Sequence, residues 1–278
     1  MREMGANPGR SGHRMAVAAA QAIEETRVLL ARLFNAPDYR RIIFSLNCTD
    51  SLNMALKGFL KPGDHVIADA MSHNSLVRPL NKLAHEGVAV TFVKPDPETQ
   101  VISIAGLKEA LRRETRLLAI THASNVHGSI QPLRECGHFA REHGLTFLVD
   151  AAQTAGVLPI DVQEDCVDLL AFPGHKSLLG PMGTGGLYVG PGVELDSARE
   201  GGTGFASEEE EQPGGLPYAL ESGTPNAPGI AGLGAGVKYV LERGINEIGA
   251  HEQRLIQRIV EGLEEIRGAM VYRARDGV

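Results

Sequence analysis

The sequence predicts an α/β protein whose central sheet is mainly parallel. Short apolar runs alternate with segments of helical periodicity along most of the chain, which is typical of βαβ units. Seven runs have the length and composition of buried strands: residues 42–46, 65–68, 88–93, 117–121, 146–150, 169–172 and 187–189. In such sheets ligands bind beyond the carboxyl ends of the strands, so the residues after each run are the place to seek a site.

Helical patterns stand at both ends of this series. Residues 15–33 carry apolar side chains at helical spacing and predict an amphipathic helix with no strand before it. A loop rich in Gly, Pro and Glu extends to residue 217, and residues 229–267 again have a helical pattern. We expect a large domain over residues 1–228, incomplete at its N-terminus. Residues 229–278 would form a linking helix and the start of a smaller, incomplete C-terminal α+β domain.

The amino-acid composition and charge of the chain argue against several classes of function. The chain has 278 residues, of which 43% are hydrophobic, and this is enough for a sizeable core. The formal net charge is -7 and no basic run occurs, which argues against a nucleic-acid surface. The absence of an apolar run of membrane-spanning length or a secretory leader pattern predicts no membrane association and a cytoplasmic location. Cys48, Cys136 and Cys166 are too scattered for a disulfide framework and are expected to be reduced thiols.

An aspartate and a lysine follow two of the predicted strands. Asp150 ends one strand, and Lys176 follows another in Phe172-Pro173-Gly174-His175-Lys176, shortly before a glycine run. A pyridoxal phosphate (PLP) enzyme needs this pair, because the lysine amine binds the cofactor as a Schiff base. The carboxylate keeps the pyridine nitrogen protonated, which makes the ring an electron sink. A nucleotide P-loop at Gly174 is disfavoured, since His175 separates Gly from Lys and the upstream glycine is missing.

Residues after two earlier strands suit the ends of the same cofactor. Cys48 and Thr49 begin a helical pattern, where free N–H groups and a hydroxyl can hold a phosphate. Asp50 is equally explained as a simple helix N-cap. His73 can lie flat on the pyridine ring and move a proton, although a single loop histidine is more often only solvated.

Two amides complete this group of candidate residues. Asn125 and Gln153 each follow a strand end and can donate a hydrogen bond to the ring oxygen of the cofactor. Isolated loop amides are commonly turn formers, so their assignment depends on the lysine.

The ordered motifs resemble those of class V aminotransferases, and within them the cysteine desulfurase and selenocysteine lyase branch. The resemblance covers nearly the whole chain and rests on Asn7-Pro8-Gly9-Arg10-Ser11-Gly12-His13-Arg14, Cys48-Thr49-Asp50, Ser72-His73-Asn74, Ser124-Asn125, Asp150-Ala151-Ala152-Gln153, Gly174-His175-Lys176 and Glu221-Ser222-Gly223-Thr224-Pro225-Asn226. It implies a fold type I PLP-dependent transferase with a seven-stranded sheet flanked by helices. It also implies cysteine or selenocysteine as the substrate, with sulfur leaving cysteine as an enzyme persulfide plus alanine.

The resemblance also implies a role for each matching residue. Lys176 is the Schiff-base lysine and Asp150 the partner of the pyridine nitrogen. The remaining cofactor contacts are Gln153 and Asn125 at the ring oxygen, His73 stacked on the ring, Thr49 and His175 at the phosphate, and Cys48 as a further cofactor-binding residue. Thr224 reaches the phosphate of the neighbouring subunit, which implies a homodimer, and a sulfur-acceptor protein is a possible further partner.

Three departures from the family pattern qualify these expectations. Pro173 stands where the family has a phosphate-binding hydroxyl residue. The family's opening Asp-Asn-Ala-Ala segment is missing, as is the C-terminal region with the persulfide-forming Cys and the carboxylate-binding Arg. We therefore expect a fragment, truncated at both ends, that binds PLP but turns over little cysteine. Another class V aminotransferase or lyase, and a non-catalytic or poorly folded truncation product, remain as alternatives.

Overall fold

The computed structural model describes residues 6–8, 12–205 and 208–274. Residues 9–11 of the opening motif lie outside the described part. The strands are β1 (Ile42–Ser45), β2 (His65–Asp69), β3 (Ala89–Val93), β4 (Thr115–Thr121), β5 (Thr146–Asp150), β6 (Leu169–Pro173) and β7 (Gly185–Val189). The helices are α1 (Arg14–Leu33), α2 (Cys48–Phe59), α3 (Asn74–His85), α4 (Ile104–Ala110), α5 (Leu133–Glu142), α6 (Ala227–Arg243) and α7 (Ile245–Glu264), with a 3-10 turn at Tyr39–Arg41.

The described strands form one seven-stranded sheet in the order β1-β7-β6-β5-β4-β2-β3. Strand β7 is antiparallel to both β1 and β6, and the other neighbouring pairs are parallel. The predicted mainly parallel sheet is therefore confirmed. Because β7 runs opposite to its two neighbours, β1, β2, β4, β5 and β6 all end at the same edge.

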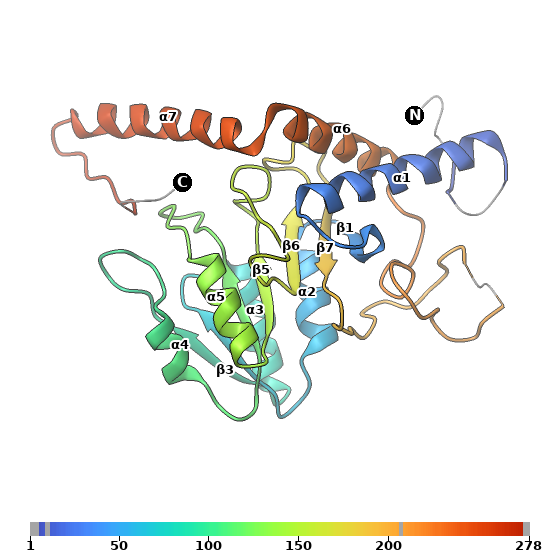
Figure 1. The fold of residues 1–278 in the computed structure, drawn as a ribbon, viewed down its shortest axis with the longest axis horizontal. Coiled ribbons are helices and arrows are strands. Elements are labelled where there is room, and N and C mark those ends of the chain that lie inside the picture. The colour runs from blue at the N-terminus through green and yellow to red at the C-terminus, as the bar shows by residue number, and fades with distance from the viewer. Residues whose placement is uncertain (1–5, 9–11, 206–207, 275–278) are drawn as a thin grey trace.

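Helices cover both faces of the sheet (Figure 1). Alternate residues of the buried strands point to opposite sides. Val66 of β2 belongs to the core under α2 and α3, whereas Ile67 belongs to the core under α1, α5 and α6. In the same way, Leu148 of β5 and its neighbours Phe147 and Val149 pack on opposite faces. Burial on both faces explains why the strands appear in the sequence as continuous apolar runs.

The long helical pattern expected over residues 229–267 forms two helices rather than one. The break lies at Gly244, whose φ of 88° is readily adopted only by glycine. Helix α6 packs beside α1 at the top of Figure 1 and adds Leu233 and Val237 to the main core. Helix α7 extends away from the sheet, and its one buried residue is Val260. The domain boundary at residue 228 stays a prediction.

The first turn of α2 shows that Asp50 is not the N-cap of this helix, as the sequence had allowed. Asn47, not Asp50, is the N-cap, and its side chain accepts a hydrogen bond from the Asp50 N–H. Asp50 lies in the first turn, where its carboxylate accepts from the Leu46 N–H and pairs with Arg199. An acidic side chain is favourable there because it faces the positive end of the helix dipole.

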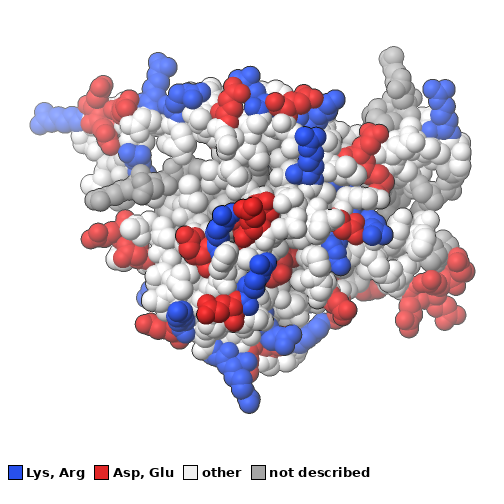
Figure 2. Space-filling view, viewed as in Figure 1, with Lys and Arg blue, Asp and Glu red and all other residues white. Residues whose placement is uncertain are grey.

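Lysine and arginine side chains are interspersed with acidic ones on the face seen in Figure 2. Among the described residues, none of the helices combines the length and apolarity needed to cross a membrane.

Candidate active site

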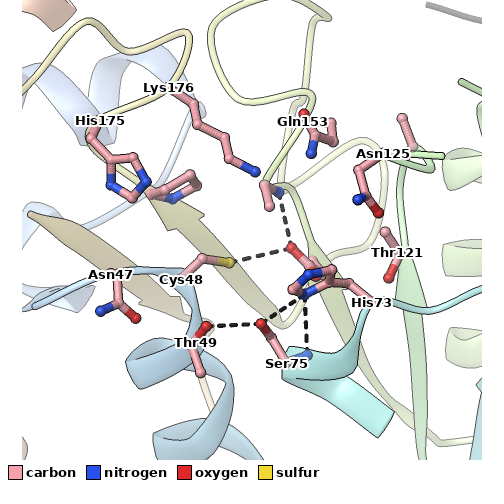
Figure 3. A pocket seen from close by; sticks show the side chains of 14 residues that line it. Asn47, Cys48, Thr49, His73, Ser75, Thr121, Asn125, Gln153, His175 and Lys176 are labelled. Atoms are coloured by element: carbon pink, nitrogen blue, oxygen red, sulfur yellow. Dashed lines mark hydrogen bonds between the residues drawn. The ribbon is translucent and has the colours of Figure 1, made fainter. Parts of the chain in front are cut away.

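A pocket lies at the sheet edge where β1, β2, β4, β5 and β6 end (Figure 3). Its cavity volume is about 130 Å³. The loop after each of these strands contributes side chains, as expected for an open α/β sheet. The lining residues are Asn47, Cys48, Thr49, His73, Ser75, Thr121, Ala123, Asn125, Asp150, Ala152, Gln153, Pro173, His175 and Lys176.

Asp150 is the buried acid of this pocket, with 1% of its surface exposed. Its Oδ1 accepts hydrogen bonds from the Ala152 N–H at 2.9 Å and from the Cys48 thiol at 3.2 Å. Within the described residues, Oδ2 receives no hydrogen bond. Burial raises the pKa of Asp150, and the hydrogen bonds and the nearby His73 and Lys176 partly offset this effect. A cationic ring N–H would satisfy the open oxygen and favour the ionised carboxylate.

Lys176 reaches the pocket from the loop after β6. This loop is held by hydrogen bonds from the Gly174 N–H to the Thr184 carbonyl and from the Gly180 N–H to the Gly174 carbonyl, each 2.8 Å long. The side chain of Lys176 extends its amine into the pocket, and it forms no hydrogen bond or ion pair with the described residues (Figure 3). An amine placed in this way is available to a ligand.

A chain of hydroxyl groups joins the first turns of α2 and α3. Thr49 Oγ1 lies 2.8 Å from Ser75 Oγ, and Ser75 Oγ lies 2.8 Å from Nδ1 of His73 (Figure 3). The Ser75 N–H also donates to Nδ1 at 3.1 Å, which makes His73 the N-cap of α3. Nδ1 therefore acts as an acceptor, and the proton of the neutral ring is assigned to Nε2.

The start of α2 offers donors for an anion. The N–H groups of Cys48 and Thr49 find no acceptor in the described part of the chain, and the hydroxyl of Thr49 lines the pocket beside them. The hydroxyl of Thr121 is buried, finds no hydrogen-bond partner among the described residues, and also belongs to the lining. PLP brings a phosphate, a ring nitrogen and an aldehyde, so the free N–H groups, the open oxygen of Asp150 and the amine of Lys176 fit it chemically.

Eight of the nine predicted site residues line this one pocket: Cys48, Thr49, His73, Asn125, Asp150, Gln153, His175 and Lys176. Thr224 does not, and it lines a separate cavity together with Arg27 and Glu221. Pro173 lies in the pocket wall, so the departure from the family pattern is located at the site itself. The individual roles of these residues stay predictions.

Other residues of the lining were not predicted from the sequence. Ser75 links His73 to Thr49, and Asn47 caps the helix that carries Thr49. Thr121 pairs with Asp150 in the β4–β5 register. The signal for Thr121 was its position as the last residue of a predicted strand that ends beside the strand of Asp150.

In the part of the chain that the structure describes, no group of three or more His, Cys, Asp or Glu side chains is arranged to bind a metal ion.

Comparisons with known proteins give one family. The sequence model of the family "Aminotransferase class-V" matches residues 1–277. A probable cysteine desulfurase of Methanothermobacter thermautotrophicus is 34% identical over 98% of this chain and 68% of its own length. The apo structure of a cysteine desulfurase from Thermococcus onnurineus NA1 aligns with a TM-score of 0.87 and 31% identity, over 95% of this chain and 67% of that chain.

A third similar protein is SspA, solved in complex with cysteine, with a TM-score of 0.75 and 32% identity over 85% of this chain and 65% of that chain. The chain thus spans about two thirds of the length of these proteins. The sheet, its helices and these neighbours agree with fold type I of the PLP enzymes. The chain belongs to the class-V aminotransferase family, within its cysteine desulfurase branch.

Proposed function

We propose that this protein is a PLP-dependent cysteine desulfurase, which takes sulfur from L-cysteine and leaves alanine. The observation that carries the proposal is the pairing of a buried carboxylate, open at Oδ2, with the free amine of Lys176 in one pocket. Members of the family are PLP-dependent, and the similar protein SspA has been solved with cysteine. Selenocysteine is a second substrate of the same chemical class.

The residues of the pocket would hold the cofactor at three points. Lys176 would bind its aldehyde covalently, and Asp150 would pair with the ring nitrogen. When bound, PLP supplies an electron sink for the negative charge left on the substrate when a bond at Cα breaks. The other contacts would come from His73 on the ring face, Asn125 and Gln153 at the ring oxygen, and Thr49, Cys48, His175 and the first N–H groups of α2 at the phosphate.

Protons would be moved by His73 and Lys176. The ring of His73 is held through Nδ1 by Ser75, so Nε2 is the nitrogen free to exchange a proton. In the proposed reaction, an acceptor thiol attacks the sulfur of cysteine and forms a persulfide, while the carbon that loses sulfur gains a proton and becomes the methyl group of alanine. Cys48 is unsuited to be that thiol, because burial and the charge of Asp150 raise its pKa well above the ordinary value.

Further features of the full activity belong to the same proposal. Thr224, in its separate cavity, would reach the phosphate of a second copy, which implies a homodimer. A protein that accepts the persulfide sulfur is a further expected partner, and the cytoplasmic location stays a prediction.

The test is covalent capture of the cofactor. The purified chain is incubated with PLP, reduced with borohydride and digested, and a phosphopyridoxyl mass is expected on the peptide that contains Lys176. Lys176→Ala should lose this label, while the control Lys57→Ala, which removes an exposed lysine of α2, should keep it. A label that persists in Lys176→Ala would move the role to another lysine, and an unlabelled parent chain would contradict the proposal.

The products then distinguish the proposed reaction from other class V chemistry. With cysteine as substrate and a thiol reductant as sulfur acceptor, a desulfurase gives equal amounts of alanine and sulfide. The low rate of turnover expected from the sequence stays a prediction. A transaminase would instead give a keto acid without sulfide.

A further inference from the structure

The thiol of Cys48 lies against the carboxylate of Asp150 in the wall of the pocket. Cys48 is the first residue of α2, and Asp150 is the last residue of β5, 102 positions later. Sγ is 3.2 Å from Oδ1, and the two residues are 7% and 1% exposed (Figure 3). The contact is therefore shielded from water.

The direction of this hydrogen bond is fixed by chemistry. An ionised carboxylate only accepts, so the thiol is the donor. Burial, followed by the charge of Asp150, raises the pKa of the Cys48 thiol well above its ordinary value. The thiol therefore keeps its proton at neutral pH and can go on donating.

The two hydrogen bonds to Asp150 come from different elements but reach the same oxygen. The Ala152 N–H fixes Oδ1 from the loop after β5, and the Cys48 thiol fixes it from α2. Rotation of the carboxylate would break both contacts, so Oδ2 remains the oxygen available to a ligand. The next residue of α2, Thr49, lies at the proposed phosphate end of the pocket. The first turn of α2 therefore contributes to both the phosphate end and the ring-nitrogen end of the cofactor site.

We propose that Cys48 is a positioning residue, whose thiol holds the Asp150 carboxylate with Oδ2 directed to the ring nitrogen of bound PLP. This role rests on the proposed function. It differs from that of a sulfur-accepting nucleophile, because the thiol acts through its proton and forms no covalent bond.

The contact itself can be tested without cofactor. The infrared S–H stretching band that disappears in Cys48→Ala belongs to Cys48, and Cys136→Ala should leave that band in place. A thiol that donates to a carboxylate absorbs at lower frequency than a free thiol, so Asp150→Ala, which removes the acceptor, should shift the Cys48 band upward. A band at the same frequency in Asp150→Ala would overturn the proposal.

The consequence for the cofactor is tested by PLP affinity, measured by equilibrium dialysis. Cys48→Ala should weaken binding about tenfold, because a hydrogen bond to a charged group is lost. Cys48→Ser keeps a donor of similar size and should stay within about twofold of the parent. The control Cys136→Ala removes a buried thiol of α5, which is outside the pocket, and should bind PLP like the parent.

The outcomes separate the two proposals. If the parent binds PLP and Cys48→Ala binds it equally well, the positioning role fails and the proposed function stands. If the parent itself binds no PLP, the proposed function fails and the positioning role fails with it.

Discussion

The guanidinium of Arg27 on α1 holds the carboxylate of Glu221 through two parallel contacts, Nη1 to Oε1 at 2.8 Å and Nη2 to Oε2 at 3.0 Å. The Arg27 side chain is 2% exposed, and its guanidinium lies 4.6 Å from the centre of the Phe44 ring. The Phe44 N–H of β1 donates to the same carboxylate at 2.6 Å. This pair therefore fixes the segment that carries Thr224, three residues later, to α1 and β1.

Removal of the Glu221 carboxylate should destabilise the native state by more than the loss of its own hydrogen bonds. In Glu221→Ala the buried guanidinium of Arg27 keeps only Glu24 and the Ile42 carbonyl as partners among the described residues, and we expect a loss of about 3 kcal/mol in the free energy of unfolding. Urea unfolding at neutral pH measures it. The control Glu114→Ala breaks an exposed pair with Arg113 and should leave the free energy of unfolding almost unchanged. Equal losses in the two variants would show that the Arg27 charge is not buried in solution.

Asp150→Asn should make the PLP-free protein more stable while it weakens PLP binding. Burial raises the pKa of Asp150, so the native state binds more protons than the unfolded state at pH values above the ordinary pKa of 3.8. Native stability therefore decreases as pH rises through the raised pKa, and at pH 8 the buried charge is a net cost. Asparagine keeps an acceptor for the Cys48 thiol and the Ala152 N–H without that charge.

Thermal unfolding between pH 4 and pH 8 tests this prediction. The midpoint of Asp150→Asn should exceed that of the parent at pH 8, by about 2–4 °C for each kcal/mol recovered, and the difference should shrink toward pH 4. A lower midpoint at every pH would mean that the carboxylate stabilises the native state.

His122 should make stability fall in mild acid. Burial lowers its pKa from 6.5 to about 4, and its Nδ1 lies 2.9 Å from the hydroxyl of Thr154. Between these two pKa values the imidazole is protonated in the unfolded chain but not in the native state. The free energy of unfolding therefore falls as pH decreases from 6.5 to 4. The slope from this one group is at most about 1.4 kcal/mol per pH unit.

Denaturant unfolding of His122→Gln across the same pH range checks this effect. In this variant the free energy of unfolding should fall less steeply as pH decreases. The slope should differ from that of the parent by the uptake of up to one proton. Thr154→Ser keeps a hydroxyl beside the ring and should keep the parent's slope. The same pH slope in His122→Gln and in the parent would assign the acid sensitivity to other groups.

The sequence predicted most of the fold because the central strands are buried on both faces. Continuous runs such as Leu117–Leu118 and Phe147–Leu148 mark these strands, and the site follows because ligands collect where parallel strands end. The break at Gly244 was missed, since helical periodicity continues on both sides and only the positive φ reveals the bend. The contact of Cys48 with Asp150 was also beyond prediction, because their distance depends on how α2 packs beside β5.

Gly174 should prove essential for the placement of Lys176. A Cβ at this position would lie 2.1 Å from Thr184 Oγ1 and 2.9 Å from Thr184 Cβ, and the residue is buried. Gly174→Ala must therefore displace the turn that carries His175 and Lys176, at a cost of about 1–3 kcal/mol in unfolding free energy. The same displacement should reduce the amount of PLP that borohydride traps on Lys176.

The control is Gly262→Ala, on the exposed side of α7 with nothing within 4 Å of its Cβ. It should raise the free energy of unfolding by about 0.5–1 kcal/mol and should be labelled like the parent. If Gly174→Ala captures PLP with the parent's affinity, the turn tolerates the methyl group and the close approach to Thr184 does not position the lysine.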